Sequence, residues 1–117
     1  MWVQLELPII AYVAKIQVTN RKSYGERFKD VEVYAGEYEV NNQASNETQQ
    51  DMIWENPECN TYQGPGKNGE VIEIKCNGQF YGNFIIIQMV HPDVTYMNIA
   101  EVKAYIYIAN DGKYFKK

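Results

Sequence analysis

Histidine is nearly absent from this sequence, and its scarcity bears on catalysis. The single histidine, His91, is followed by Pro92 and Asp93 in a segment typical of a turn, where a histidine is more often solvated than catalytic. No motif places a histidine beside a serine or cysteine, and no glycine-rich loop leads from a strand into a helix. No pair stands out among the 15 acidic residues, so glycoside hydrolysis is not indicated. The sequence predicts a protein that is not an enzyme.

Positive charge and long apolar runs are also scarce. The chain has 11 basic and 15 acidic residues and a net charge of -4, whereas nucleic-acid binding requires a basic face. Lys113, Lys116 and Lys117 form a basic cluster that we interpret as a solvated terminus. No stretch is long enough to span a membrane. Met1 is not followed by the basic region and cleavage site of a signal peptide, which says little if the chain is part of a longer protein. We expect neither nucleic-acid binding nor membrane insertion.

Helical periodicity is missing, because no stretch of ten or more residues carries an apolar stripe. Apolar and polar residues instead alternate over residues 3–7, 15–19, 31–34, 72–76 and 100–106. Residues 84–87 are continuously apolar, as expected for a strand buried on both faces. Pro8 is expected to follow the first strand, and the polar connection 41–68 is either a binding element or, as we favour, a crossover between sheets. The pattern predicts a single all-β domain, residues 1–117, built as an antiparallel β-sandwich without helices.

Cysteine occurs only twice, at Cys59 and Cys76. Two thiols with no further cysteine or histidine nearby make a poor zinc site. They are either free buried thiols or, as we favour, a disulfide that stabilises the fold by roughly 3 kcal/mol. A disulfide indicates an oxidising compartment, and Asn46-Glu47-Thr48 matches the acceptor triplet for N-glycosylation at Asn46. These features favour a secreted or extracellular protein.

One loop carries candidate binding residues. Residues 19–28 join two expected strands and place Arg21 and Arg27 on the same connection. Guanidinium groups offer a rigid fork of hydrogen-bond donors, which suits the vicinal hydroxyls of a sugar. Tyr24 can supply an apolar face for a sugar ring. The alternative is a solvated loop in which Glu26 pairs with an arginine.

A family resemblance favours the sugar-binding interpretation. It rests, in chain order, on Trp2-Val3-Gln4-Leu5, Thr19-Asn20-Arg21, Gly25-Glu26-Arg27, Val31-Glu32-Val33-Tyr34-Ala35-Gly36, Asn56-Pro57-Glu58-Cys59, the strand ending at Cys76, Gly82-Asn83-Phe84-Ile85-Ile86-Ile87 and Ala100-Glu101-Val102-Lys103-Ala104-Tyr105. Together these segments resemble the sugar-binding domain of fucolectins (F-type lectins), within the discoidin or coagulation-factor type C group. The resemblance covers nearly all of the chain and implies a jelly-roll, galactose-binding-like β-sandwich.

The resemblance also implies site residues. In that family a histidine and two arginines hold fucose, and Arg21 and Arg27 match the arginines. The histidine would lie before Met1, so the resemblance implies a domain that lacks its amino-terminal portion. The family's calcium site uses that same stretch together with a glutamate matched by Glu101, next to the backbone of Ala100. The family's aspartate near the start is replaced by Gln4, and its acidic residue and cysteine pair by Ser23-Tyr24 in a loop one residue shorter.

Two functions follow as expectations. The first is a secreted lectin domain that binds fucose or a similar glycan through Arg21, Arg27 and Tyr24, with glycans or glycoproteins as partners and calcium as a cofactor. The second is a discoidin-type adhesion or protein-binding module without sugar affinity, in which Tyr24 and Trp54 contact the partner. Additional domains in a parent protein are compatible with both.

Overall fold

The computed structural model describes residues 1–90, 99–110 and 113–116, and from residue 108 onward it describes the backbone alone. His91, Pro92 and Asp93 therefore lie outside the described residues. The strands and helices, in chain order, are β1 (Trp2–Asn20), the 3-10 helix η1 (Gly25–Arg27), β2 (Val31–Gly36), α1 (Asn46–Trp54), β3 (Glu58–Tyr62), β4 (Val71–Met89), β5 (Ile99–Asn110) and β6 (Lys113–Lys116). All strands belong to one sheet with the order β3-β2-β4-β1-β5-β6, and its neighbours pair antiparallel.

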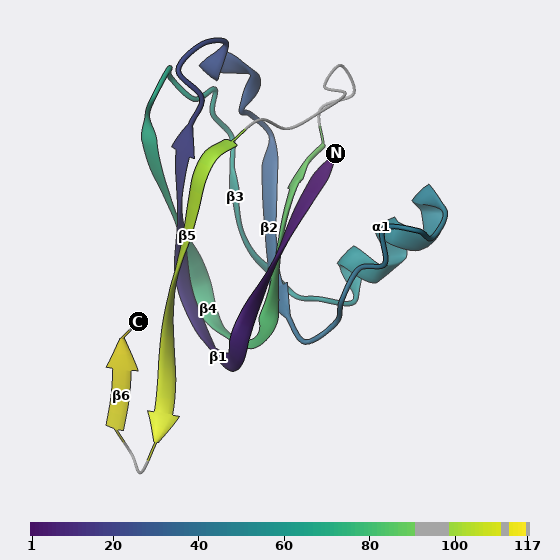
Figure 1. Cartoon of the computed structure of the whole chain (residues 1–117), viewed down its shortest axis with the longest axis vertical. Coiled ribbons are helices and arrows are strands. Elements are labelled where there is room, and N and C mark those ends of the chain that lie inside the picture. Colours follow the sequence, from purple (N-terminus) through teal and green to yellow (C-terminus); the bar gives the residue numbers. More distant parts are fainter. Residues whose placement is uncertain (91–98, 111–112, 117) are drawn as a thin grey trace.

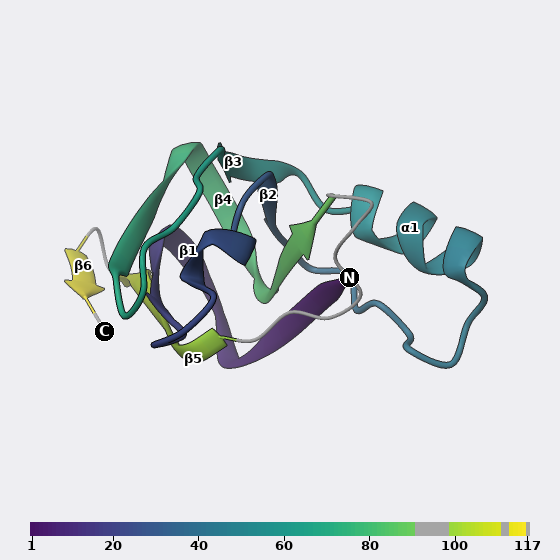
Figure 2. The ribbon, with the colours of Figure 1, turned by 90° about the horizontal axis from the view of Figure 1, so that it is seen from above.

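The two longest strands give this single sheet two layers. β1 and β4 each span 19 residues, and each is bent into a V so that its two halves lie in different layers (Figures 1 and 2). Residues 2–6 of β1 pair with 84–88 of β4, and β2 and β3 extend this layer. Residues 15–19 of β1 pair with 71–75 of β4, and β5 and β6 extend the other layer. The expected antiparallel β-sandwich is confirmed, but segments expected as separate strands are halves of one strand.

Pro8 corrects one expectation, because it lies inside β1 and does not follow a completed strand. The pairing of β1 with β4 is interrupted between Glu6 and Ala11, which is where β1 bends. Proline has no backbone N–H to donate, so strands accommodate it at such interruptions of the ladder. Pro8 thus marks the bend between the two layers and does not end the strand.

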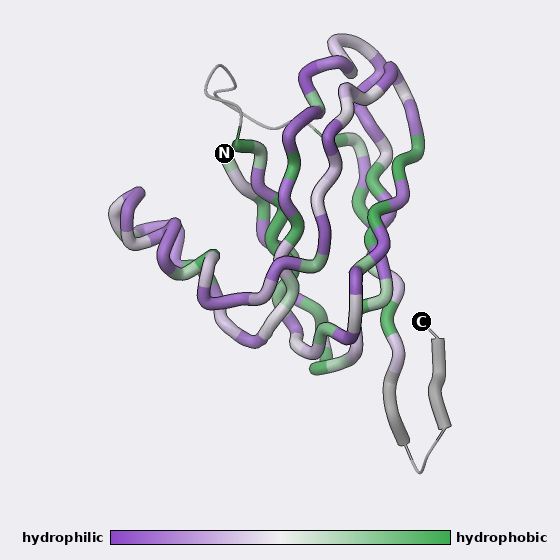
Figure 3. Tube along the Cα trace, turned by 180° about the vertical axis from the view of Figure 1, so that it is seen from behind, coloured by the Kyte–Doolittle hydropathy of each residue, from purple (hydrophilic) through white to green (hydrophobic). Residues whose placement is uncertain are grey.

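The core explains the alternating pattern. Inward residues of both layers form the main cluster, which includes Ile16 and Val18 of β1, Ile85 and Ile87 of β4, and Val33 of β2. Each of these five side chains is fully buried, and burying such a side chain stabilises the fold by about 1.5–3 kcal/mol. Figure 3 shows hydrophobic residues concentrated along the paired strands, with hydrophilic residues along much of α1 and the end loops.

The continuously apolar run 84–87 is buried on both faces, as expected. Ile85 and Ile87 face the core between the layers, whereas Phe84 and Ile86 face a second apolar cluster. That second cluster contains the fully buried Ile53 of α1. The helix therefore covers the outer face of one layer.

Helix α1 contradicts the expectation of a helix-free chain. It lies in the connection 41–68 and is capped by Ser45, whose Oγ accepts a 3.2 Å hydrogen bond from the Thr48 N–H. The helix has nine residues and buries only Ile53 fully, so it is too short and too polar to show an apolar stripe. The same connection contains β3, which pairs with β2 in one layer, and only the segment between Tyr62 and Val71 crosses to the other layer.

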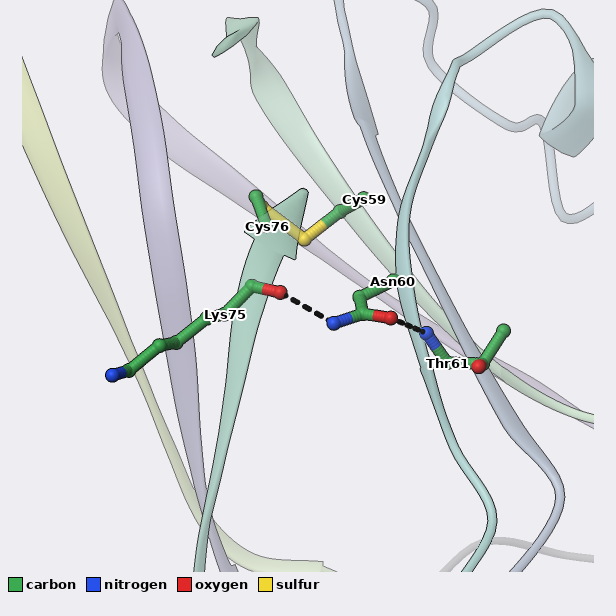
Figure 4. Close-up of a disulfide and its surroundings, with 5 residues drawn as sticks. All are labelled: Cys59, Asn60, Thr61, Lys75 and Cys76. Atoms are coloured by element: carbon green, nitrogen blue, oxygen red, sulfur yellow. Dashed lines mark hydrogen bonds between the residues drawn. A yellow bond between two sulfur atoms is a disulfide. The ribbon is translucent and has the colours of Figure 1, made fainter. Parts of the chain in front are cut away.

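The predicted disulfide is confirmed. Cys59 of β3 and Cys76 of β4 are bonded, with their Cα atoms 4.4 Å apart (Figure 4). Beside the disulfide, the Asn60 Nδ2 donates a 2.7 Å hydrogen bond to the carbonyl of Lys75, and its Oδ1 accepts one from the Thr61 N–H. These bonds tie the edge strand of one layer to the bent strand that continues into both.

Candidate functional site

The loop between β1 and β2 has an unusual backbone. Tyr24 adopts φ 58° and ψ 33°, in the left-handed region that a residue with a bulky side chain rarely occupies. It precedes the single turn of η1, which the Phe28 N–H closes by donating to the Gly25 carbonyl over 3.1 Å. Strain of this kind costs on the order of 1–3 kcal/mol and persists only where the surroundings hold the residue in place. It is found mainly at functional sites, and here it directs Tyr24 outward with 55% of its surface exposed.

Two asparagines hold this loop against the segment that leads into β4. Asn20 is 1% exposed, and its Nδ2 donates 2.9 Å hydrogen bonds to the carbonyls of Gly25 and Lys67, while its Oδ1 accepts one from the Arg21 N–H. From the other side, the Asn68 Oδ1 accepts a 2.7 Å hydrogen bond from the Gly25 N–H. The two asparagines thus hold the loop at Gly25, the residue next to Tyr24.

The structure brings the predicted loop residues together. The guanidinium carbon of Arg27 lies 4.5 Å from the centre of the Tyr24 ring, and that of Arg21 lies 5.5 Å from the same centre. Cation–π contacts at exposed positions contribute about 0.5–1 kcal/mol each. Arg27 is exposed and Arg21 is half-buried, so both can reach a ligand from the end of the sandwich. In Figure 1 this loop is at the top, opposite the bends of β1 and β4.

The two residues expected to hold calcium, Glu101 and Ala100, lie on β5 and not on the arginine loop. Glu101 and Ala100 are exposed near the start of β5, and the Glu101 carboxylate lies 3.9 Å from the Lys103 ammonium. Among the described residues, no three histidine, cysteine, aspartate or glutamate side chains gather around a common point. Calcium takes about six to eight oxygen ligands, more than one carboxylate and one backbone carbonyl supply. The described residues alone therefore do not form a calcium site, and calcium stays a prediction that requires further ligands.

The groups with shifted pKa values lack the properties of acid–base catalysts. Burial, reinforced by the hydrogen bond to Glu32, raises the pKa of the Tyr34 hydroxyl far above its ordinary value. Burial also raises the pKa of Tyr62. The hydrogen bond from Lys15 lowers the pKa of the Glu73 carboxyl. Each shift moves the group away from neutral pH, whereas an effective general acid or base has a pKa near it.

Asn46, the expected glycosylation acceptor, is the first residue of α1 and is exposed to solvent. No helix in the part of the chain that the structure describes is long and apolar enough to cross a membrane.

The bent strands and the disulfide between β3 and β4 define the class: an antiparallel all-β sandwich with the fucolectin fold. A solved structure bears this out. The crystal structure of an F-lectin (fucolectin) from the serum of striped bass, Morone saxatilis, matches with a TM-score of 0.69 and 24% sequence identity. The match covers 90% of this chain but only 31% of that chain.

At this identity the likeness shows the fold. That structural neighbour is a lectin. No protein-family model matches the chain, and no curated protein matches it either.

Proposed function

We propose that the chain is an extracellular carbohydrate-binding module that binds fucose-type glycans through Arg21, Tyr24 and Arg27. The observation that carries the proposal is the approach of two guanidinium groups to one exposed tyrosine ring. The fold that the chain shares with a fucolectin supports the proposal, because the arginine loop lies at one end of the same kind of sandwich. The disulfide supports the extracellular part, since such bonds persist in oxidising compartments.

The chemistry of the loop suits a neutral sugar. The guanidinium N–H groups donate hydrogen bonds in a fixed plane, which matches two adjacent hydroxyl oxygens. The exposed part of the Tyr24 ring offers an apolar surface to a methyl group or a C–H face of the sugar. Because Asn20 and Asn68 already hold the loop, little conformational entropy is lost on binding. Binding stays weak because a monosaccharide offers few atoms to an open site.

We expect fucose to bind the chain in isothermal titration calorimetry, and Arg21→Ala or Arg27→Ala to abolish detectable binding. Each substitution removes a charge-assisted hydrogen bond worth roughly 1.5–3 kcal/mol, about a 10- to 150-fold change in affinity. Arg21→Lys should also impair binding, because an ammonium lacks the planar fork. Lys22→Ala is the matched control, since Lys22 is an exposed cation on the same loop. If the arginine variants bind fucose as tightly as the unmodified chain, the sugar-binding site lies elsewhere on the molecule.

A protein-binding role is the second candidate, favoured by the exposure of aromatic residues at α1. Trp54 at the end of the helix is 62% exposed, and Tyr38 in the preceding connection is 56% exposed. Exposed aromatic side chains are common anchors of protein interfaces. If no glycan on an array binds the chain, while a protein without glycans binds it and loses affinity with Trp54→Ala, the module is an adhesion domain and not a lectin.

We further propose that Asn46 is N-glycosylated in a secretory pathway, because the triplet Asn46-Glu47-Thr48 is on the surface. When eukaryotic cells secrete the chain, its mass should exceed that of the polypeptide alone. Glycosidase treatment should return it to the polypeptide mass. Asn46→Gln should abolish the added mass. Asn42→Gln, an exposed asparagine outside any acceptor triplet, should leave it unchanged. Secretion at the bare polypeptide mass would refute this modification.

A further inference from the structure

Two cavities near the start of β1 share Trp2 in their linings, and the first also includes Met1. The first, of about 380 Å³, is lined by Trp2, Asn46, Gln49, Gln50 and Gln88, with Ile53 among its apolar contacts. The second, of about 650 Å³, shares Trp2 and is lined also by Gln4, Glu39, Asn41 and Asn42. Both volumes are in the range of sites that bind small ligands. Trp2 thus lines both cavities, and each cavity has amide side chains in its wall.

The indole at the centre is held in a fixed position. The Trp2 Nε1 donates a 2.9 Å hydrogen bond to the Gln49 Oε1. The Gln49 Nε2 in turn donates to the carbonyls of Ala44 and Asn42 over 2.8 and 3.1 Å. Trp2 also packs against the apolar cluster that contains Ile53. A ring locked by packing and hydrogen bonds loses no rotamer freedom when a ligand stacks on it.

An amide pair completes the first cavity. Gln50 of α1 and Gln88 of β4 exchange two hydrogen bonds, with Nε2–Oε1 distances of 3.2 and 2.6 Å. Gln88 is only 7% exposed, so the pair fixes two amides at the cavity wall. Each primary amide has two N–H donors and two acceptor lone pairs, and the pair uses one of each. One donor and one acceptor per amide are left for a ligand that has both, such as a hydroxyl group.

We infer that the groove around Trp2 is a second binding site, for a neutral oligosaccharide. An indole face with flanking amides matches the apolar face and the hydroxyls of a sugar. Glu39 is the one charged side chain among the described residues that line the two cavities, so no side chain there attracts an anionic ligand. An oligosaccharide is long enough to contact both cavities, which share Trp2. The inference rests on this groove and does not depend on the arginine loop.

The test uses Trp2 as its own reporter. Trp54→Phe removes the second tryptophan of the chain, so that fluorescence comes from Trp2 alone. Titration of this variant with cellotriose, chitotriose and mannotriose should give a saturable change in emission for at least one trisaccharide, with a dissociation constant in the roughly millimolar range. Adding Gln50→Ala should weaken binding by about 5- to 10-fold, because it removes one amide from the cavity wall and leaves Gln88 without the two hydrogen bonds that fix its side chain. Gln63→Ala, an exposed glutamine on the β3–β4 connection, should have no effect.

Two further variants and two contrary results decide the inference. Asn42→Ala, at an exposed position in the lining of the second cavity, should also weaken the response, which covers the case in which Gln50→Ala impairs folding. Arg27→Ala should leave the Trp2 response intact, and this separates the groove from the proposed fucose site. No response to any of the three trisaccharides overturns the inference. So does a response that folded Gln50→Ala and Asn42→Ala both retain at full strength.

Discussion

Replacing Cys59 and Cys76 with alanine should lower the free energy of unfolding by about 3 kcal/mol. The disulfide closes a loop with a sequence separation of 17 residues, and the chain-entropy model gives roughly this value for such a loop. Cys59 is also 1% exposed in the main core, so its truncation adds a small packing loss. Thermal denaturation should show a melting temperature lower by roughly 10 °C for a domain of this size.

The reductant dependence supplies the control for this prediction. Adding dithiothreitol should lower the melting temperature of the unmodified chain by a similar amount. The double alanine variant should not respond, because it has no disulfide to reduce. A melting temperature of the unmodified chain that stays constant under full reduction, with reduction verified by thiol titration, would contradict the stabilising role of this bond.

Replacing Gly82 with alanine should destabilise the fold by a similar amount. Gly82 lies at the bend of β4, where the end of β2 passes, and a Cβ atom there would overlap the carbonyl of Gly36. Because both contacting atoms belong to the backbone, no side-chain rotation relieves the clash. We expect a loss of about 3 kcal/mol, the upper range for overpacking, measured by urea denaturation.

Gly69→Ala is the matched control for this substitution. Gly69 has φ 69° but nothing within 4 Å of its hypothetical Cβ, so the same change costs only the backbone strain, about 1 kcal/mol. Equal destabilisation by Gly82→Ala and Gly69→Ala would show that the close approach of β2 and β4 does not limit the residue at position 82.

Much of the sheet could be predicted because alternation is a local property. The pattern over 15–19 and 72–76 records which residues face the core, and these segments pair with one another in the structure. The run 84–87 indicated burial on both faces, which α1 and the opposite layer provide. Alternation does not reveal that segments belong to one bent strand, and for this reason Pro8 was misinterpreted as following a strand.

The candidate site was predicted in part. The resemblance indicated Arg21 and Arg27, and the structure places both beside Tyr24. The anchoring role of Asn20 was missed, although its signal is present: it continues the inward-facing series of Ile16 and Val18 and is therefore a polar residue in a core position. No comparable signal marks Asn68, because its contact with Gly25 joins loops 43 residues apart.

The sequence by itself determined the all-β class and the positions of the inward-facing residues, because periodicity is readable along the chain. It favoured a disulfide between its two cysteines, and the structure contains that bond. Tertiary structure alone decided the bends of β1 and β4, the packing of α1 on the outer face, and the amide groove around Trp2. Each of these depends on contacts between residues far apart in the chain, such as Gln50 with Gln88 and Trp2 with Gln49. An exposed glutamine and a glutamine that lines a groove are the same residue in a sequence, and only the neighbours supplied by folding distinguish them.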